Sequence, residues 1–213
     1  MDERIPKPSS LSCGEFACAL AARTSTPGGG GAAALAGALG VALCSMAARF
    51  SAGKPSRAEV EDDIQRVIDE AEAIRAKLVG LIDADADAFA AFSHAYAFPK
   101  DDPLRGQLIE AAATQAAFVP IETMRTVARS VELLEEMETY STRLLISDVG
   151  CGAALASAAL TAASLNVFVN TNMMSDAEHA SDINDECDRL LDTYVPRADT
   201  LARRVGARIR GRA

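Results

Sequence analysis

Residues 57–96 read RAEVEDDIQRVIDEAEAIRAKLVGLIDADADAFAAFSHAY, and they carry the clearest periodic pattern of the chain. A mostly apolar seam recurs every three or four positions and comprises Ile64, Val67, Ala71, Ile74, Leu78, Ile82, Asp85, Phe89, Phe92 and Tyr96. This spacing is typical of a helix that buries one face. We therefore predict one long helix over residues 57–96, which ends before Pro99 because proline cannot continue it.

Asp85 stands in this seam at a position where the pattern requires an apolar residue. Burying an unpaired carboxylate is costly, so we expect it to be hydrogen-bonded, paired, or protonated with a raised pKa. Such a group is a candidate general acid or base. The alternative is a structural carboxylate that caps the start of a neighbouring helix. Asp83 and Asp87 fall on other faces and are predicted to be solvated or to lie at the rim.

The rest of the chain is also helical in pattern. We predict helices over residues 12–23, 31–50, 103–137, 147–170 and 177–208, with Pro120 and Pro196 kinking or breaking two of them. The β-like run NVFVN at 166–170 is too short to make a sheet. The prediction is one all-α domain over residues 1–213, a bundle of about six long antiparallel helices, with 1–8 and 210–213 flexible. Helices about 50 Å long exceed what a compact monomer can cover, which favours a homodimer.

The composition excludes several classes of protein. The net charge of −9 argues against a general binder of nucleic acid or of anionic membranes. With only 2 histidines and no CxxC spacing, we expect no metal site. The 5 cysteines are scattered, which indicates reduced thiols and a cytoplasmic location. The apolar run 32–48 is predicted to be a buried helix, since a membrane span needs about 20 residues.

Residues 24–31 read TSTPGGGG and run directly into an alanine-rich helix. Gly28, Gly29, Gly30 and Gly31 let backbone N–H groups approach a ligand closely, and the helix start adds a positive dipole. The segment is not a P-loop, because no Gly-Lys-Ser/Thr follows, and no strand precedes it as a dinucleotide fingerprint requires. The alternative is tight helix–helix packing at a corner.

Three further polar residues interrupt apolar segments. Asp148, with Ser147, begins an alanine-rich helix, where both are good N-cap residues; a role in a site is the alternative. Asn166 and Asn170 flank VFV near the end of that helix. Their amides either close the helix or point into a pocket, where they offer both donors and acceptors to a heterocycle.

Basic residues gather after the glycine-led helix. Lys54 follows Gly53, with Arg49 and Arg57 nearby. They complement the C-terminal helix dipole, or they receive a ligand that carries a carboxylate. His94 is predicted to lie on a helix surface, and His179, among acidic residues, to be solvated.

Four segments in this order resemble the cyclodeaminase/cyclohydrolase family, and the resemblance covers about residues 10–205. They are PGGGGAAALAGALGVAL, GLIDADADAFAAF, AYAFPK and ISDVGCGAALASAALTAASLNVFVN. The family contains the cyclodeaminase half of formiminotransferase-cyclodeaminase and stand-alone methenyltetrahydrofolate cyclohydrolases. The resemblance implies an all-α dimer that takes a folate as substrate and needs no metal or other cofactor.

The resemblance also implies roles for particular residues. Gly28, Gly29 and Gly30 match the family's glycine loop, whereas Gly31 stands where many members have serine. Asp85 matches the acidic position of the long helix and is the predicted proton-transfer group. Asp148, Asn166 and Asn170 match an SD…NVxxN segment, and Lys54 matches a basic residue that would meet the folate tail. The stretch TYSTRLL before ISD departs from the asparagines usual there.

The function implied is hydrolysis of 5,10-methenyltetrahydrofolate to 10-formyltetrahydrofolate, with Asp85 and Asp148 as the catalytic residues and Asp85 as the one that transfers the proton. The same pocket would suit a formiminotetrahydrofolate cyclodeaminase that closes the ring and releases ammonia. A third reading is a non-catalytic, folate-binding helical dimer in which Asp85 is structural.

Overall fold

The computed structural model describes residues 6–212, and these form helices and turns without a strand. The elements are η1 (Pro8–Ser10), α1 (Cys13–Ala21), α2 (Gly29–Ser51), η2 (Pro55–Val60), α3 (Glu61–Tyr96), α4 (Arg105–Tyr140), α5 (Ile146–Thr171) and α6 (Ala177–Ile209). The all-α prediction is therefore confirmed, and the NVFVN run lies within α5. Of the segments expected to be flexible, residues 1–5 and 213 lie outside the described residues, whereas Pro8 belongs to a 3-10 turn.

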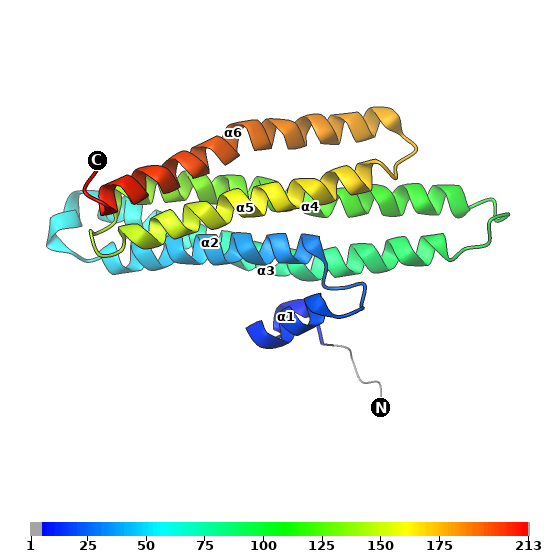
Figure 1. Ribbon diagram of the computed structural model, residues 1–213, viewed down its shortest axis with the longest axis horizontal. Coiled ribbons are helices and arrows are strands. Elements are labelled where there is room, and N and C mark those ends of the chain that lie inside the picture. The colour runs from blue at the N-terminus through cyan, green and yellow to red at the C-terminus, as the bar shows by residue number, and fades with distance from the viewer. Residues whose placement is uncertain (1–5, 213) are drawn as a thin grey trace.

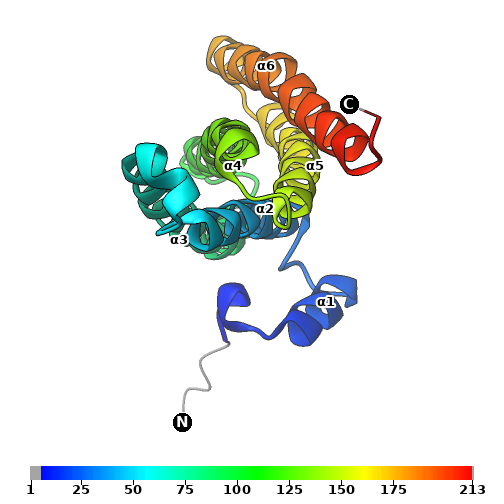
Figure 2. The ribbon, with the colours of Figure 1, turned by 90° about the vertical axis from the view of Figure 1, so that its left-hand side faces the viewer.

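Five long helices, α2 to α6, lie along a common direction, and successive ones run in opposite senses (Figure 1). α2 packs against α3 and α5, α4 also packs against α3 and α5, and α6 covers α5 and α4. Seen from the end, α1 sits to one side of this bundle (Figure 2). Phe16 attaches α1, because its buried ring packs with Ala34 of α2 and Ile82 of α3.

The apolar seam of α3 is buried as predicted from Ile64 to Ile82. Beyond Asp85 the prediction is wrong, since Phe89 is 42% exposed and Tyr96 45% exposed. The reason lies in α2, which runs antiparallel to α3 and has its first turn, at Gly31, beside Ile82 and Asp85. The last turns of α3 therefore extend past the start of α2, and their apolar side chains face an opening.

Small residues let α2 and α5 cross with their backbones in contact. A Cβ added at Gly152 would lie 2.8 Å from the carbonyl oxygen of Gly40, and one added at Gly40 would lie 3.0 Å from that of Gly152. Real Cβ atoms essentially never approach another atom to 2.8 Å, so Gly152 requires glycine, and a side chain at Gly40 would force the backbone of α5 to shift. The alanine-rich composition of these two helices serves the same close approach.

By length and composition alone, α2 and α5 could each cross a membrane. In this fold they are packed at the centre of the bundle, and 61% of the most apolar window of α2 is buried against its neighbours. The run at 32–48 is thus a core helix, as predicted, which also agrees with its burial of Ala33, Ala38 and Val41.

The two internal prolines do not end their helices. α4 continues through Pro120, and α6 continues through Pro196, so the break considered at Pro196 is wrong. Figure 1 shows α6 changing direction partway along its length. At the start of α1 the structure has the expected capping box, in which Ser12 and Glu15 each bond the other's backbone N–H.

Candidate active site

A cavity of about 270 Å³ opens where the first turn of α2 meets α3, α4 and α5. Its lining combines backbone, one carboxylate, two amides and an apolar wall: Ser25, Thr26, Gly28, Gly29, Gly30, Asp85, Ala88, Phe89, Phe92, Ala116, Asn166, Val169, Asn170 and Met173. An apolar pocket with a few convergent polar groups is the usual form of a small-molecule site. Six of the nine residues predicted for the site line it; the three others are Gly31, Asp148 and Lys54.

Asp85 projects from α3 onto the start of α2. Its Oδ2 accepts a hydrogen bond of 2.9 Å from the backbone N–H of Gly31. This N–H is one of the four in the first turn that no helical carbonyl can satisfy. The structural reading of Asp85, a cap for a neighbouring helix, is therefore correct, and Asp85 also lines the cavity.

Gly30 shows why the loop contains glycines. A Cβ added there would lie 2.6 Å from Asp85 Cγ and closer still to Oδ1. At Gly29, a Cβ would touch the side chain of Asn166 at 3.4 Å. The carboxylate thus rests directly against the backbone of α2, and only glycine at position 30 permits this.

Burial raises the pKa of Asp85 above its ordinary value of 3.8, and the hydrogen bond from Gly31 partly opposes this shift. Burial disfavours the charged form, whereas an N–H donor and a helix N-terminus favour it. The carboxyl group therefore binds a proton more readily than an exposed aspartate does. That property suits a group that accepts and returns a proton.

Two amides of α5 face the carboxylate across the cavity. Asn170 Nδ2 donates to the carbonyl oxygen of Ala116 on α4 at 2.7 Å. Asn166 Nδ2 donates to the carbonyl oxygen of Ala162 in its own helix at 2.9 Å. Among the side-chain hydrogen bonds of residues 6–212, none ends on the Oδ1 atom of either asparagine, so both can accept one from a ligand.

Phe89 and Phe92 form part of the apolar wall, with Val169 and Met173 opposite on α5 and the turn after it. The sequence pattern placed both phenylalanines in the core seam. The signal for their true place was present, because they follow Asp85 by four and seven residues and so share its helix face. Ala116 and Met173, which also line the cavity, carried no such signal.

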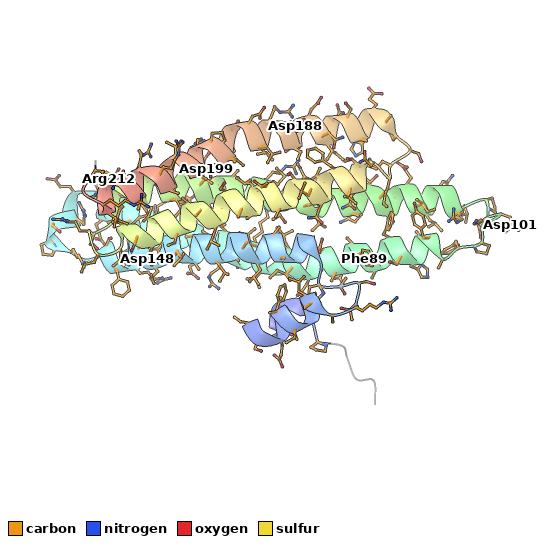
Figure 3. The ribbon with its side chains drawn as sticks, viewed as in Figure 1. Phe89, Asp101, Asp148, Asp188, Asp199 and Arg212 are labelled. Carbon is orange, nitrogen blue, oxygen red and sulfur yellow. The ribbon has the colours of Figure 1, made fainter. Side chains whose placement is uncertain are left out.

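Asp148 lies in the first turn of α5, whereas Asn166 is near its end. The two are about 27 Å apart along the helix at 1.5 Å per residue. Figure 3 shows Asp148 near the opposite end of the bundle from Phe89. Asp148 therefore does not join the cavity within one chain. It is not the N-cap either, since that residue is Leu145.

Lys54 also lies at the far end, because it follows α2, whose 23 residues span about 35 Å from the cavity. The neighbouring arginines are engaged within the chain. Arg49 pairs with Glu72 at 3.5 Å, and Arg57 Nη2 donates to the carbonyl oxygen of Ser141 at 3.0 Å. The latter contact anchors the TYSTRLL stretch that departs from the family pattern.

Asp83 was predicted to be solvated or to lie at the rim, and the structure shows it half-buried and hydrogen-bonded. It accepts hydrogen bonds from the backbone N–H and the hydroxyl of Ser9, at 2.9 and 2.6 Å, and so holds η1 on α3. Asp87, His94 and His179 are exposed, as predicted. Within residues 6–212 no three His, Cys, Asp or Glu side chains gather closely enough to hold a metal ion.

The fold and the cavity together define an all-α bundle protein with one carboxyl group in a largely apolar cavity. The chain belongs to the formiminotransferase-cyclodeaminase family, whose sequence signature matches residues 12–189. The predicted resemblance is thereby confirmed.

Three relatives show how far the similarity extends. A methenyltetrahydrofolate cyclohydrolase of Methylorubrum extorquens is 37% identical over 180 residues, which are 83% of this chain and 86% of the relative. The formimidoyltransferase-cyclodeaminase of Mus musculus is 32% identical over 76% of this chain, which spans only 30% of that longer protein. The crystal structure of a formiminotetrahydrofolate cyclodeaminase from Thermotoga maritima superposes with a TM-score of 0.81 at 27% identity, over 92% of this chain and 98% of that one.

Proposed function

We propose that the protein hydrolyses 5,10-methenyltetrahydrofolate to 10-formyltetrahydrofolate. The observation that carries the proposal is Asp85, a half-buried carboxylate with a raised pKa in an apolar cavity that two amides share. A relative named as this cyclohydrolase, similar over most of both chains, supports the choice of substrate.

In the proposed mechanism, the one-carbon unit lies between two folate nitrogens and is electrophilic as an amidinium. Asp85 accepts a proton from a water molecule while the oxygen bonds to this carbon. The protonated carboxyl then gives this proton to one ring nitrogen as the bond from that nitrogen to the carbon breaks, while the added hydroxyl loses its own proton to solvent and becomes the formyl oxygen on the other nitrogen. Water thus supplies the formyl oxygen and the proton on the ring nitrogen, one proton is released as the cationic substrate becomes a neutral product, and Asp85 returns to its ionised form. A base of this kind contributes about 10²–10⁴ in rate.

The other cavity residues would bind and orient the substrate. The Oδ1 atoms of Asn166 and Asn170 can accept hydrogen bonds from the N–H edge of the pterin. Phe89 and Phe92 offer apolar faces to the ring system. Gly28, Gly29 and Gly30 leave room for the ligand beside the start of α2, and Gly31 contributes through the N–H that holds Asp85.

Formiminotetrahydrofolate cyclodeaminase is the second candidate, and one observation favours it. The structural alignment with the Thermotoga maritima protein of this name covers 98% of that chain. Both reactions would use the same carboxylate.

Two parallel spectrophotometric assays separate the candidates. One follows the loss of near-ultraviolet absorbance of 5,10-methenyltetrahydrofolate above its spontaneous hydrolysis. The other follows the appearance of this chromophore, with ammonia, from 5-formiminotetrahydrofolate. Decay in the first assay alone supports the cyclohydrolase, and formation in the second identifies the cyclodeaminase. Silence in both, with folate still bound, would leave the non-catalytic reading.

We also propose that the protein acts as a homodimer in the cytoplasm. Apolar side chains line one exposed face of α2, with Leu39 51% and Phe50 59% exposed, and water contact with such a face is unfavourable. Light scattering should give about twice the chain mass of 22.3 kDa. Leu39→Glu should yield monomers, whereas Leu144→Glu, in an 85% exposed loop position, should not. A wild-type monomer would contradict the proposal.

Lys54 lies far from the cavity of its own chain, so we propose that in the dimer Lys54 of a second copy contacts the anionic tail of the folate. Lys54→Ala should then raise KM, and the effect should weaken with added salt. An unchanged KM would remove Lys54 from the site. We further propose that no metal or organic cofactor takes part, so dialysis against a chelator should leave turnover unchanged.

A further inference from the structure

We propose that Pro120 is a positioning residue of the site, because it frees the carbonyl group that holds the amide of Asn170. The inference concerns a hydrogen bond between α4 and α5. Its consequence for substrate rests on the function proposed above, but the bond itself does not.

The first step is the geometry of α4. In an α-helix the carbonyl of residue i accepts from the N–H of residue i+4. Pro120 has no N–H, so the carbonyl of Ala116 loses its helical donor. α4 nevertheless continues through this point, and both residues are buried. A buried carbonyl without a partner is costly, so another donor is required.

That donor is the side chain of Asn170. Its Nδ2 lies 2.7 Å from the carbonyl oxygen of Ala116, and both residues line the cavity. Asn166 provides a contrast, since its amide bonds Ala162 one turn back in its own helix. Asn170 is thus the amide that the neighbouring helix holds in place.

The second step is the direction of the amide. Because the carbonyl of Ala116 accepts and cannot donate, it selects the NH₂ side of the Asn170 amide. The Oδ1 atom is left to face away from α4 as a fixed acceptor. A ligand with an N–H donor at this place would bind without having to reorient the amide, and one with only an acceptor would be disfavoured.

A residue with a backbone N–H at position 120 should no longer leave the Asn170 amide fixed in one orientation. In Pro120→Ala, the helix itself supplies a donor to Ala116, and the Asn170 amide competes with it. The amide then turns more freely and presents either of its ends. We expect KM to rise about two- to tenfold, the value of one neutral hydrogen bond, with kcat little changed.

A kinetic cycle tests the coupling. Asn170→Ala should raise KM at least as much as Pro120→Ala, and the double variant should be no worse than Asn170→Ala alone. Pro196→Ala is the matched control, because Pro196 also lies inside a helix but neither it nor any other residue of α6 lines the cavity, and it should leave KM unchanged. Additive effects of the two changes would overturn the proposal.

A thermal unfolding cycle tests the bond without any assay of activity. Asn170→Ala leaves the carbonyl of Ala116 unpaired and should lower Tm by about 2–10 °C. In the Pro120→Ala background, Asn170→Ala should lower Tm much less, because the N–H of residue 120 now donates to the carbonyl of Ala116. Equal losses in both backgrounds would overturn the proposal. If the stability cycle shows coupling but the wild type turns over neither folate, only the proposed function fails.

Discussion

Asp85 is subject to two opposing influences from its surroundings. Burial in the cavity favours the neutral carboxylic acid, whereas the N–H of Gly31 and the start of α2 favour the carboxylate. Burial has the larger effect, so the pKa of Asp85 is raised, and the bond from Gly31 limits the shift. A carboxyl with a raised pKa is a stronger base than an exposed aspartate, which suits the proton transfer proposed for it.

Turnover should depend on this one group. Asp85→Asn retains the shape and an oxygen that can accept from Gly31, but it cannot take a proton, so turnover should fall about 10²–10⁴-fold. In the wild type, kcat should fall with decreasing pH as the carboxylate is protonated, at a pH above 3.8. Initial rates across pH test this, and full activity of Asp85→Asn would remove the assignment.

The same shift has a consequence for stability. The pKa of Asp85 is higher in the folded protein than in the unfolded chain. At a pH between these two pKa values the folded protein binds one more proton than the unfolded chain, so the free energy of unfolding falls as the pH rises through this range. Asp85→Asn avoids burying the charge and should have a higher Tm than the wild type at pH 7. The difference should disappear below about pH 3.8, where both are neutral. Scanning calorimetry at the two pH values tests this sign.

Gly30 should tolerate no side chain. Gly30→Ala would push a methyl group against the Asp85 carboxyl, which must move and lose its bond to Gly31. We expect turnover to fall at least tenfold, with the far end of the bundle unaffected. Gly80→Ala is the control, because no atom lies within 4 Å of a Cβ there, and it should retain activity. Equal activity of the two variants would contradict the proposed geometry.

At the scale of the elements, the crossing of α2 and α5 places the two ends of the site. Gly29 and Gly30 begin α2, and Asn166 and Asn170 lie near the end of the antiparallel α5. The backbone contact between Gly40 and Gly152 sets how closely these helices approach. The distance across the cavity therefore depends on packing about 15 Å along α2 from it.

Gly152→Ala should loosen this crossing. Its methyl group would meet the carbonyl of Gly40 and the side chain of Leu134, both at 2.8 Å. Overpacking of this kind destabilises by about 1–3 kcal/mol. Gly206→Ala, in open space on α6, should instead be neutral or stabilise by about 0.5–1 kcal/mol. Denaturant unfolding of both variants measures the difference, and a neutral Gly152→Ala would refute the close crossing.

At the scale of the whole molecule, α6 buries fewer of its side chains than the other long helices do. Two of its arginines pair with glutamates of α4, and pairs of the same kind also join α3 to α4. Arg197 meets Glu135 at 2.6 Å, and Arg204 meets Glu138 at 2.6 Å, in partly exposed pairs. Exposed pairs contribute about 0.2–1 kcal/mol each and weaken with salt. The outer helix is thus docked more weakly than the core.

Hydrogen exchange should reveal this difference. The amides of α6 should exchange through local opening before those of α2, which lies at the centre of the bundle. Raising the salt from about 0.05 to 0.5 M should speed exchange in α6 and leave α2 nearly unchanged. Mass spectrometry of peptides from both helices measures this, and equal protection would show that α6 unfolds only with the core.

Much of this protein followed from local pattern. The three- and four-residue spacing placed Ile64 to Ile82 on one helix face, and the polar interruption at Asp85 marked the site. The glycines at 28–30 and the amides at 166 and 170 were also found, because each contrasts with its apolar neighbours. Such signals depend only on the residues of one helix, and the sequence alone determined them.

The tertiary structure decided which helix ends meet. Asp148 and Lys54 carry suitable chemistry, but the alternating direction of the helices puts them at the other end of the bundle. By pattern, Phe89 and Phe92 belong to the buried face of α3. They line the cavity instead, because the last turns of α3 extend past the first turn of α2 and α2 does not cover them. The bond from Asn170 to the carbonyl that Pro120 frees joins residues 54 positions apart on two successive helices. Periodicity in the sequence predicts which face of its helix a side chain occupies. Which residues pack against that face is determined only by the tertiary structure.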